Sequence, residues 1–226
     1  MILALFVALI CYLIVQVVFI SRNGIKEPLI PPKGNILIID TETDCIPKDC
    51  DATALNTENS PRIIGLAYNK IAPNGQLLSK NYFIISPDYF SIGSGEPNID
   101  ICSNTDIQEN RISIKIVLDW IDKEAVDCKY LVAHNIDFVY AVVFSEYSRL
   151  NLDTNNLSSL KRICTMKGSI NIFKIPSSNG YKNPSLNDLH QELFSSGITG
   201  MNNPQTNAEH CMRCFKELFN RKVIRL

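Results

Sequence analysis

Short apolar runs along the chain predict several strands. Residues 35–40, NILIID, and residues 129–134, KYLVAH, are aliphatic runs of the length typical of buried strands. Residues 61–71 and 75–86 flank the turn signal Ala-Pro-Asn-Gly and predict a β-hairpin. Residues 162–166, RICTM, favour a further short strand. These strands are expected to form a sheet.

A helical period replaces the strand pattern later in the chain. It predicts helices over residues 113–127, 137–150 and 206–222. Another helix is expected to begin at Ser185, where Asp188 completes a weak form of the capping box. The polar segment between the hairpin and the first helix is rich in Gly, Pro and Asn and is expected to be a loop. Strands that first follow one another and then alternate with helices predict a mixed sheet covered by helices.

The first residues differ from the rest of the chain. Residues 1–20 are apolar throughout except for Gln16 and carry no charge. At ~1.5 Å rise per residue, a helix of this length spans roughly the 30 Å hydrocarbon layer of a bilayer. We therefore expect a transmembrane signal-anchor helix over residues 1–21, a linker over 22–34 and one globular domain over 35–226.

A cleaved signal peptide is the alternative interpretation of the first segment. The run has no Lys or Arg before it, is long for a signal peptide, and is followed by no small-x-small cleavage site. Arg22, Lys26 and Lys33 follow the run, and the positive-inside tendency therefore favours a single-pass protein with its domain on the cytoplasmic side.

Charge is divided unevenly along the chain, although the net charge is only −1. Residues 1–150 hold 12 Lys and Arg against 18 Asp and Glu, whereas residues 151–226 hold 10 against 5. The basic C-terminal part could contact a phosphate backbone, and solvated helix faces explain the same excess.

The eight cysteines are irregularly spaced, which favours free thiols in a cytoplasmic domain. Cys211 and Cys214, preceded by His210, have a spacing that zinc can use, and Cys45 and Cys50 could complete such a site. The pair also lies within a helical apolar pattern, which favours core packing.

Asp40 and Glu42 follow the first aliphatic run, two positions apart. Successive side chains of a strand face opposite ways, so these two carboxylates point to the same side. Together they could share one cation, and hard oxygen ligands suit Mg²⁺ or Mn²⁺. Such ions serve phosphoryl chemistry. The pattern Asp-x-Glu is weak by itself, because many strand ends carry solvated carboxylates.

The chain resembles the DEDDh-type 3′–5′ exonucleases, the group that contains RNase T and the proofreading subunit of the bacterial replicative polymerase. The resemblance runs from Asn35 to Lys222 and rests on the segments IIDTET, PRIIGLAY, LVAHNIDFVYAVVFSEYSRL, ICTM, GYKNPSLNDLHQELF and NAEHCMRCFKELF. It implies an RNase H-like α/β fold with a five-stranded mixed sheet flanked by helices. It also implies phosphodiester hydrolysis by two metal ions held by four carboxylates, with a histidine five residues before the last carboxylate as general base.

The family motifs are incomplete in this chain. The second motif has a carboxylate where this chain has Val139, next to Phe138. The third motif, His-x-x-x-x-Asp, aligns its histidine with Asn202 and its aspartate with Asn207. No aspartate follows Asp188, so a shifted alignment cannot restore the third motif. Asp40 and Glu42 are retained, whereas Val139, Asn202 and Asn207 are degenerate positions.

Three nearby residues are possible substitutes for the missing groups. Asp137 precedes Val139 by two residues, which turns it by ~200° to the opposite face of a helix. It is expected to cap the helix start instead. Glu209 faces away from Asn207 for the same reason. His210 is a weaker candidate for a relocated base.

The resemblance and the departures together lead to two hypotheses. The first is a membrane-anchored pseudo-exonuclease that binds a nucleic-acid end or a protein partner with little or no hydrolysis. The second is a weak Mg²⁺- or Mn²⁺-dependent 3′–5′ exonuclease that acts on single-stranded DNA or RNA through Asp40 and Glu42. A zinc or redox module built on Cys211 and Cys214 is a third, weaker alternative.

Overall fold

The computed structural model describes residues 34–44, 60–86, 111–153, 155–174, 176–177, 180–201 and 203–226. Its main sheet has six strands in the order β4-β3-β2-β1-β5-β6. Strand β1 at its centre is antiparallel to β2 and parallel to β5. The strands are β1 (Asn35–Thr43), β2 (Ile63–Ile71), β3 (Leu77–Ile85), β4 (Arg111–Ile112), β5 (Cys128–Ala133) and β6 (Lys161–Cys164). The sheet is mixed, as predicted.

The expectation of five strands is wrong by one. The sixth strand, β4, has 2 residues and pairs in parallel with the end of β3. A strand this short has no readable alternation of its own, because its pairing depends on the neighbouring β3 rather than on local sequence. It lengthens the sheet at the edge opposite β6.

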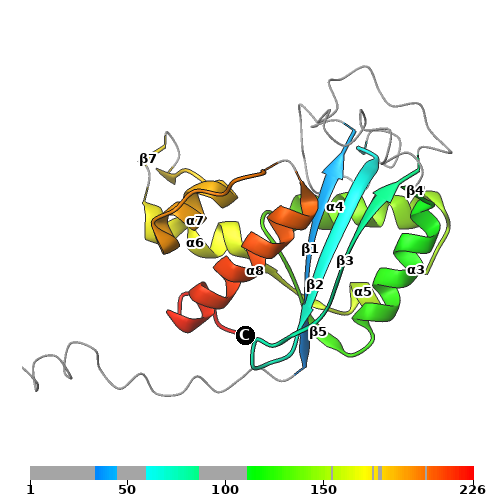
Figure 1. The fold of residues 1–226 in the computed structure, drawn as a ribbon, viewed down its shortest axis with the longest axis horizontal. Helices are drawn as coiled ribbons and strands as arrows, with labels where there is room; N and C mark the ends of the chain where they lie inside the picture. Colours follow the sequence, from blue (N-terminus) through cyan, green and yellow to red (C-terminus); the bar gives the residue numbers. More distant parts are fainter. Residues whose placement is uncertain are drawn as a thin grey trace, which may run out of the picture. The chain divides into compact units, whose positions relative to one another are not determined.

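Helices cover both faces of the sheet. On one face lie α3 (Ile114–Ala125) and α4 (Ile136–Arg149), and on the other lie α6 (Thr165–Phe173), α7 (Leu186–Phe194) and α8 (Pro204–Asn220) (Figure 1). The short helix α5 (Asn155–Ser158) precedes β6, and β7 (Pro176–Ser177) and β8 (Gly180–Tyr181) form a separate two-stranded sheet.

Two apolar clusters hold the layers together, and β1 contributes to both. Leu37 and Ile39 pack in the cluster with α3 and α4, whereas Ile36 and Ile38 pack in the cluster with α7 and α8. This alternation is that of a strand buried on both faces. It fixes which face each later residue of β1 occupies.

The predicted hairpin and helices are present. Strands β2 and β3 pair antiparallel around a turn in which Gly75 has φ +84°, a backbone conformation that glycine adopts without strain. Helix α7 begins after Ser185, whose side chain and that of Asp188 form the full capping box. The segment expected as strand 162–166 ends earlier, because Thr165 already begins α6.

Cys211 and Cys214 lie in the core, as their helical pattern predicts. Both are buried in the apolar cluster between α8, α7 and the sheet. Burial raises the pKa of the Cys214 thiol to about 12 and raises that of Cys211 as well, so both thiols stay protonated and apolar. Cys45 and Cys50 lie outside the described residues.

The predicted anchor, residues 1–21, and nearly all of the linker lie outside the described residues. Among the helices that the structure does describe, none is long and apolar enough to cross a membrane. The expected anchor and its orientation therefore stay predictions.

Candidate active site at the end of strand β1

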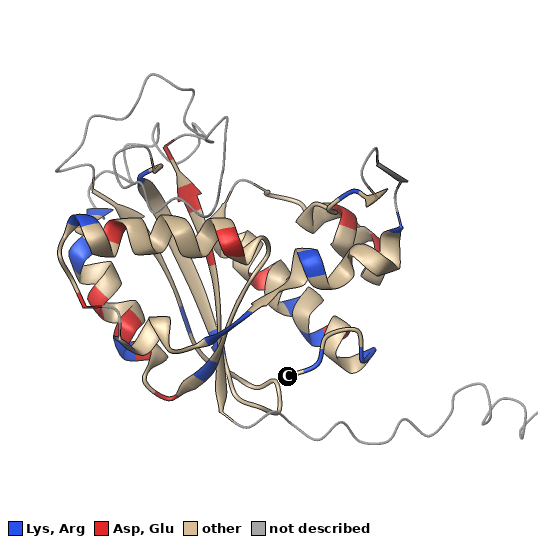
Figure 2. Cartoon of the chain, turned by 180° about the vertical axis from the view of Figure 1, so that it is seen from behind, with Lys and Arg blue, Asp and Glu red and all other residues tan. Residues whose placement is uncertain are grey.

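Asp40 and Glu42 continue the row of side chains that Ile36 and Ile38 begin on β1. They therefore lie on the face of the sheet that α8 covers. Figure 2 shows acidic positions along the carboxyl-terminal part of β1, where the strand leaves the core. Both acidic side chains are half-buried.

The neighbouring strand β2 presents small residues beside the two carboxylates. Ala67 pairs with Asp40, and Gly65 pairs with Glu42. A Cβ placed on Gly65 would lie 3.2 Å from Cγ of Pro204, the first residue of α8, and 3.6 Å from Cβ of Glu42. A side chain at this position would press against Pro204, so glycine lets β2 and the start of α8 pack closely beside Glu42.

Helix α8 brings Asn207 to Asp40. The helix starts at Pro204, and the side chain of Asn203 caps it by accepting hydrogen bonds from the backbone N–H groups of Gln205 and Thr206. One turn further, the side-chain amide of Asn207 donates a hydrogen bond to Asp40. The Oδ1 atom of Asn207 is buried, and no hydrogen-bond partner for it exists among the described residues.

The pKa of Asp40 is raised well above its ordinary value. Burial is the largest cause, repulsion from the charge of Glu42 is the next, and the hydrogen bond from Asn207 opposes both. The carboxylate pair therefore resists carrying two negative charges in the protein by itself. A cation at this position would relieve that cost.

Tyr82 of β3 stands beside the same carboxylates. Its Cε2 atom lies 3.6 Å from the position that a Cβ on Gly65 would take. Burial and the charge of Glu42 raise the pKa of the Tyr82 hydroxyl. Sequence reasoning missed both Gly65 and Tyr82. Side chains alternate between the two faces along β2 and β3. Together with the register of the hairpin, this alternation places Gly65 and Tyr82 on the face of Asp40 and Glu42.

Val139 lies in the apolar cluster between α4 and the sheet and is 3% exposed. Asp137 does not cap α4, because the helix begins after Asn135 with no side-chain cap. Asp137 instead forms an ion pair with Lys167 of α6. Asn202 lies outside the described residues.

The other two possible substitutes on α8 point elsewhere. Glu209 forms an ion pair with Lys80 of β3, with Oε1 and Nζ 2.6 Å apart. His210 packs edge-on against His190 of α7, with ring centroids 4.5 Å apart. Burial, His190 and Arg213 lower the pKa of His210, which therefore is neutral near pH 7.

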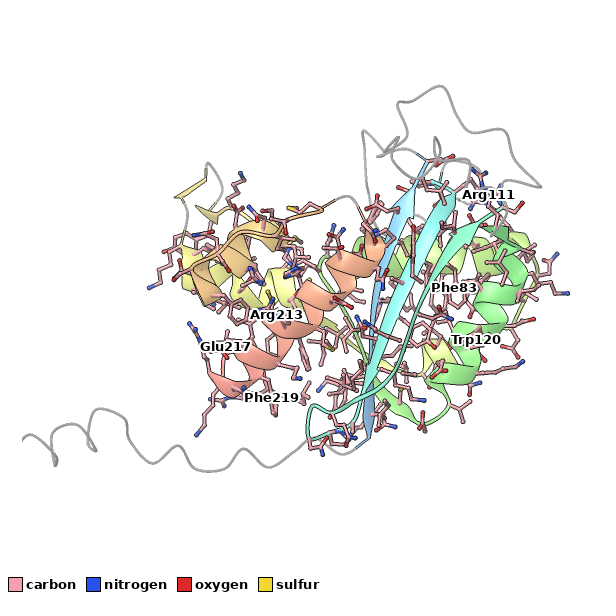
Figure 3. All side chains as sticks on the ribbon, viewed as in Figure 1. Phe83, Arg111, Trp120, Arg213, Glu217 and Phe219 are labelled. Carbon is pink, nitrogen blue, oxygen red and sulfur yellow. The ribbon has the colours of Figure 1, made fainter. Side chains whose placement is uncertain are left out.

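Several basic residues of the C-terminal part have partners within the fold. Lys216 donates to the backbone oxygen of Gly75 at 2.8 Å, and Arg221 pairs with Glu217 at 2.7 Å. Arg213 lies over the ring of Phe194, and Figure 3 shows it on α8 between the sheet and the outer helices. These three side chains therefore have structural roles within the fold.

The donor set at the end of β1 fits one hard divalent cation. Asp40 and Glu42 would supply carboxylate oxygens, and Oδ1 of Asn207 would be a neutral oxygen ligand only with its amide group turned over, because the N–H side now faces Asp40. Nowhere in the described ranges do three or more His, Cys, Asp or Glu side chains gather as a metal-ion group. The metal-binding and catalytic roles of Asp40 and Glu42 stay predictions.

Comparison with solved structures shows the fold. The chain superposes on E. coli exonuclease I in complex with a dT13 oligonucleotide with a TM-score of 0.65 at 13% identity, over 84% of this chain and 42% of that one. It superposes on the 3′-exonuclease described in "3'-end specific recognition of histone mRNA stem-loop by 3'-exonuclease" with a TM-score of 0.60 at 16% identity, over 83% and 82% of the chains.

These likenesses define the class of fold as that of the RNase H-like exonucleases. The chain spans about two-fifths of the length of E. coli exonuclease I, 42%. Searches among family models and among curated proteins each found no match.

Proposed function

We propose that this protein binds a single-stranded 3′ end of DNA or RNA with an exonuclease fold whose hydrolysis is lost or strongly reduced. The two solved structures compared above are exonucleases, one in complex with a dT13 oligonucleotide and one described as recognising a histone mRNA stem-loop. The main support for a loss of hydrolysis is the contact between Asn207 and Asp40. In the resemblance to the exonucleases, the position of Asn207 belongs to a carboxylate, whereas here it is a neutral amide.

Charge supports this proposal. Two Mg²⁺ ions bring four positive charges, and two carboxylates balance only half of them. Val139 is aliphatic and lies in the core, so it offers no ligand. Asn202 cannot accept a proton near neutral pH, and removing a general base costs on the order of 10²–10⁴ in rate.

A weak single-metal 3′–5′ exonuclease is the second candidate. The two carboxylates favour it, because one Mg²⁺ or Mn²⁺ could bind them, and Asn207 could add its Oδ1 atom if its amide group turned over. Such an ion would supply electrostatic stabilisation of the phosphate. Asp40, Glu42 and Asn207 would then hold and orient it.

A nuclease assay separates the two candidates. Purified full-length protein is incubated with labelled single-stranded DNA and RNA in Mg²⁺ and in Mn²⁺, beside an Asp40→Ala, Glu42→Ala variant. We expect no release of mononucleotides, and the same result for the variant. Digestion that requires Mn²⁺ and vanishes in the variant would establish the weak enzyme instead.

A restored variant tests the reason for the loss. We expect Val139→Asp, Asn202→His and Asn207→Asp together to cut single-stranded DNA or RNA in Mg²⁺. The Val139→Asp change places a carboxylate in the core, so folding is checked by circular dichroism in the presence of Mn²⁺. A restored protein that folds and still cuts nothing would contradict the idea that these three positions account for the lost activity.

Anchoring through residues 1–20 is proposed together with this function. It rests on the uncharged apolar run and on the basic residues that follow it. We expect the full-length protein to remain in membranes after alkaline carbonate washing, with its domain accessible to protease from the cytoplasmic side. Release by the wash would contradict the anchor and leave end binding untouched.

A further inference from the structure

Two of the three histidines of the chain, His190 of α7 and His210 of α8, are in contact with each other. Their rings pack edge to face, with centroids 4.5 Å apart. Each ring has one nitrogen, Nε2 of His190 and Nδ1 of His210, that is buried and has no hydrogen-bond partner among the described residues. Buried polar atoms normally have a partner, so these two nitrogens need an explanation.

His190 occupies an apolar position of its helix. The buried residues of α7 are Leu186, Leu189, His190 and Leu193, which have the spacing of a helix face that packs on a core. His190 is only 2% exposed. A histidine in such a place usually serves packing, with both ring nitrogens satisfied. Here one of the two is not.

The end of α7 determines which nitrogen of His190 carries the hydrogen. Ser195 ends the helix in the left-handed conformation, with φ +57°, and the backbone oxygen of Ser196 then lies 2.6 Å from Nδ1 of His190. A carbonyl oxygen only accepts, so Nδ1 donates, and Nε2 of the neutral ring presents a lone pair. An imidazole that donates to a backbone oxygen through one nitrogen, with a lone pair on the other, has the arrangement of a metal-binding histidine.

His210 offers a second lone pair from α8. Burial, His190 and Arg213 lower the pKa of His210, so its ring is neutral near pH 7, the form that metal ions bind. The tautomer with its hydrogen on Nε2 leaves the lone pair on Nδ1. His210 is half-buried, so the pair can be reached from its side. The charge of Arg213 opposes a cation here, whereas that of Glu209 favours one.

The spacing of the two rings is compatible with one shared ion. With a metal–nitrogen bond of about 2.1 Å, each ring centroid lies roughly 3.2 Å from the ion, so two imidazoles bound at right angles have centroids about 4.5 Å apart. The centroids of His190 and His210 are separated by 4.5 Å. Imidazole suits zinc, copper and nickel, whereas Mg²⁺ prefers oxygen ligands. Since the described ranges hold no group of three or more His, Cys, Asp or Glu around an ion, water would complete the coordination.

We propose that Nε2 of His190 and Nδ1 of His210 together bind one Zn²⁺ or a chemically similar late first-row divalent cation, which links α7 to α8. The site uses different ligands from the carboxylates of β1 and does not depend on the proposed function. It also differs from a zinc site on Cys211 and Cys214, whose thiols stay protonated in the core.

The test is a Zn²⁺ titration of full-length protein followed by NMR of the histidine rings. The chain has three histidines, so labelling at histidine Cε1 gives three signals to follow. His190→Gln and His210→Gln each remove one ligand. His134→Gln is the matched control, because both ring nitrogens of His134 already have partners. Mg²⁺ is the control ion, and a reducing agent keeps the cysteines as thiols.

We expect Zn²⁺, and not Mg²⁺, to shift the ring signals of His190 and His210 and to leave that of His134 in place. Either single variant of the pair should bind Zn²⁺ at least about ten-fold more weakly, read from the remaining signal of the pair. His134→Gln should bind Zn²⁺ as the natural protein does, and so should the Asp40→Ala, Glu42→Ala variant.

The half-buried position of His210 keeps the test decisive if His190→Gln, in the core, fails to fold by circular dichroism. Signals of His190 and His210 that do not move in excess Zn²⁺ would overturn the proposal. Equal Zn²⁺ affinity of His210→Gln and the natural protein would overturn it as well. Neither result would bear on nucleic-acid binding, which the nuclease assay tests separately.

Discussion

Acidic side chains lie on both faces of the sheet near the C-terminal end of β1 and the adjacent start of β2. The groups that surround them differ between the two faces. Glu146 of α4 is 1% exposed and lies between Arg62 and Arg149, with Oε1 2.8 Å from Nε of Arg62 and 3.0 Å from Nη1 of Arg149. On the other face, the influences on Asp40 are a second carboxylate and a neutral amide.

The difference separates a structural charge from a candidate functional one. The Glu146 carboxylate also accepts a hydrogen bond from the backbone N–H of Ile63. These contacts hold the start of β2 against α4. Stability alone would favour such pairing at Asp40 too, because burying like charges together costs free energy. The cost retained at Asp40 is the pattern expected where a cation binds.

The largest expected effect comes from breaking the paired group. Glu146→Gln leaves the partly buried Arg62 and Arg149 beside a neutral amide, which should lower the free energy of unfolding by about 2–4 kcal/mol. Urea unfolding followed by circular dichroism measures this change. A loss below 1 kcal/mol would show that Glu146 is not a structural charge.

The matched control is Glu209→Gln in the exposed pair with Lys80. The two side chains of this pair are 41% and 47% exposed. Water screens such pairs, so we expect a loss of at most about 1 kcal/mol. An equal loss in both variants would remove the distinction between buried and exposed pairing.

The second prediction concerns His134, which follows β5 and precedes the degenerate second-motif position Val139. Its ring nitrogens lie 3.0 Å from Oγ1 of Thr165 and 3.1 Å from the backbone oxygen of Pro184. Burial lowers the pKa of His134 from 6.5 to about 4. The unfolded chain therefore takes up this proton first, so the contribution of His134 to stability is full above pH 6.5 and falls as the pH is lowered toward 4.

We expect His134 to remove up to about 3 kcal/mol of stability over that interval of pH. Urea midpoints measured across the interval should fall less steeply for His134→Gln, which cannot ionise. Thr165→Val is the control, because it removes a partner and leaves the imidazole to titrate. Parallel curves for the natural protein and His134→Gln would contradict this assignment.

The parts of the fold that depend on local pattern could be predicted from the sequence. The hairpin of β2 and β3 and the amphipathic helices α3, α7 and α8 follow from alternation, turn residues and capping within each segment. Strand β4 could not, because two residues form a strand only when a partner is already in place. Helix α6 was missed for a related reason, since the apolar run RICTM continues across the boundary between β6 and the helix.

The candidate site was only partly readable from the sequence. The spacing of Asp40 and Glu42 indicated a shared face, and the resemblance to exonucleases indicated Asn207. Gly65 and Tyr82 belong to the same site because of the register between three strands, which no single segment encodes. The raised pKa of Asp40 likewise depends on burial under α8 and is a property of the assembled fold.

The smallest expected effect tests whether Asp40 costs stability in the metal-free protein. Because the folded protein raises the pKa of Asp40, it holds that proton more tightly than the unfolded chain does. The contribution of Asp40 to stability is then most favourable at low pH and falls as the pH rises and Asp40 ionises beside Glu42. Asp40→Asn removes this ionisation and should stabilise the protein by roughly 0.5–2 kcal/mol at neutral pH in EDTA.

Urea unfolding of Asp40→Asn and of the control Asp119→Asn, at an exposed position of α3, measures this gain. The gain should shrink toward acidic pH, where Asp40 is protonated in both states, and should be absent from the control. Mn²⁺ should stabilise the natural protein more than Asp40→Asn, because only the natural protein presents two carboxylates to the ion. An Asp40→Asn variant that is no more stable than the natural protein in EDTA would mean that Asp40 is as well compensated as Glu146, and the contrast between the two faces would fail.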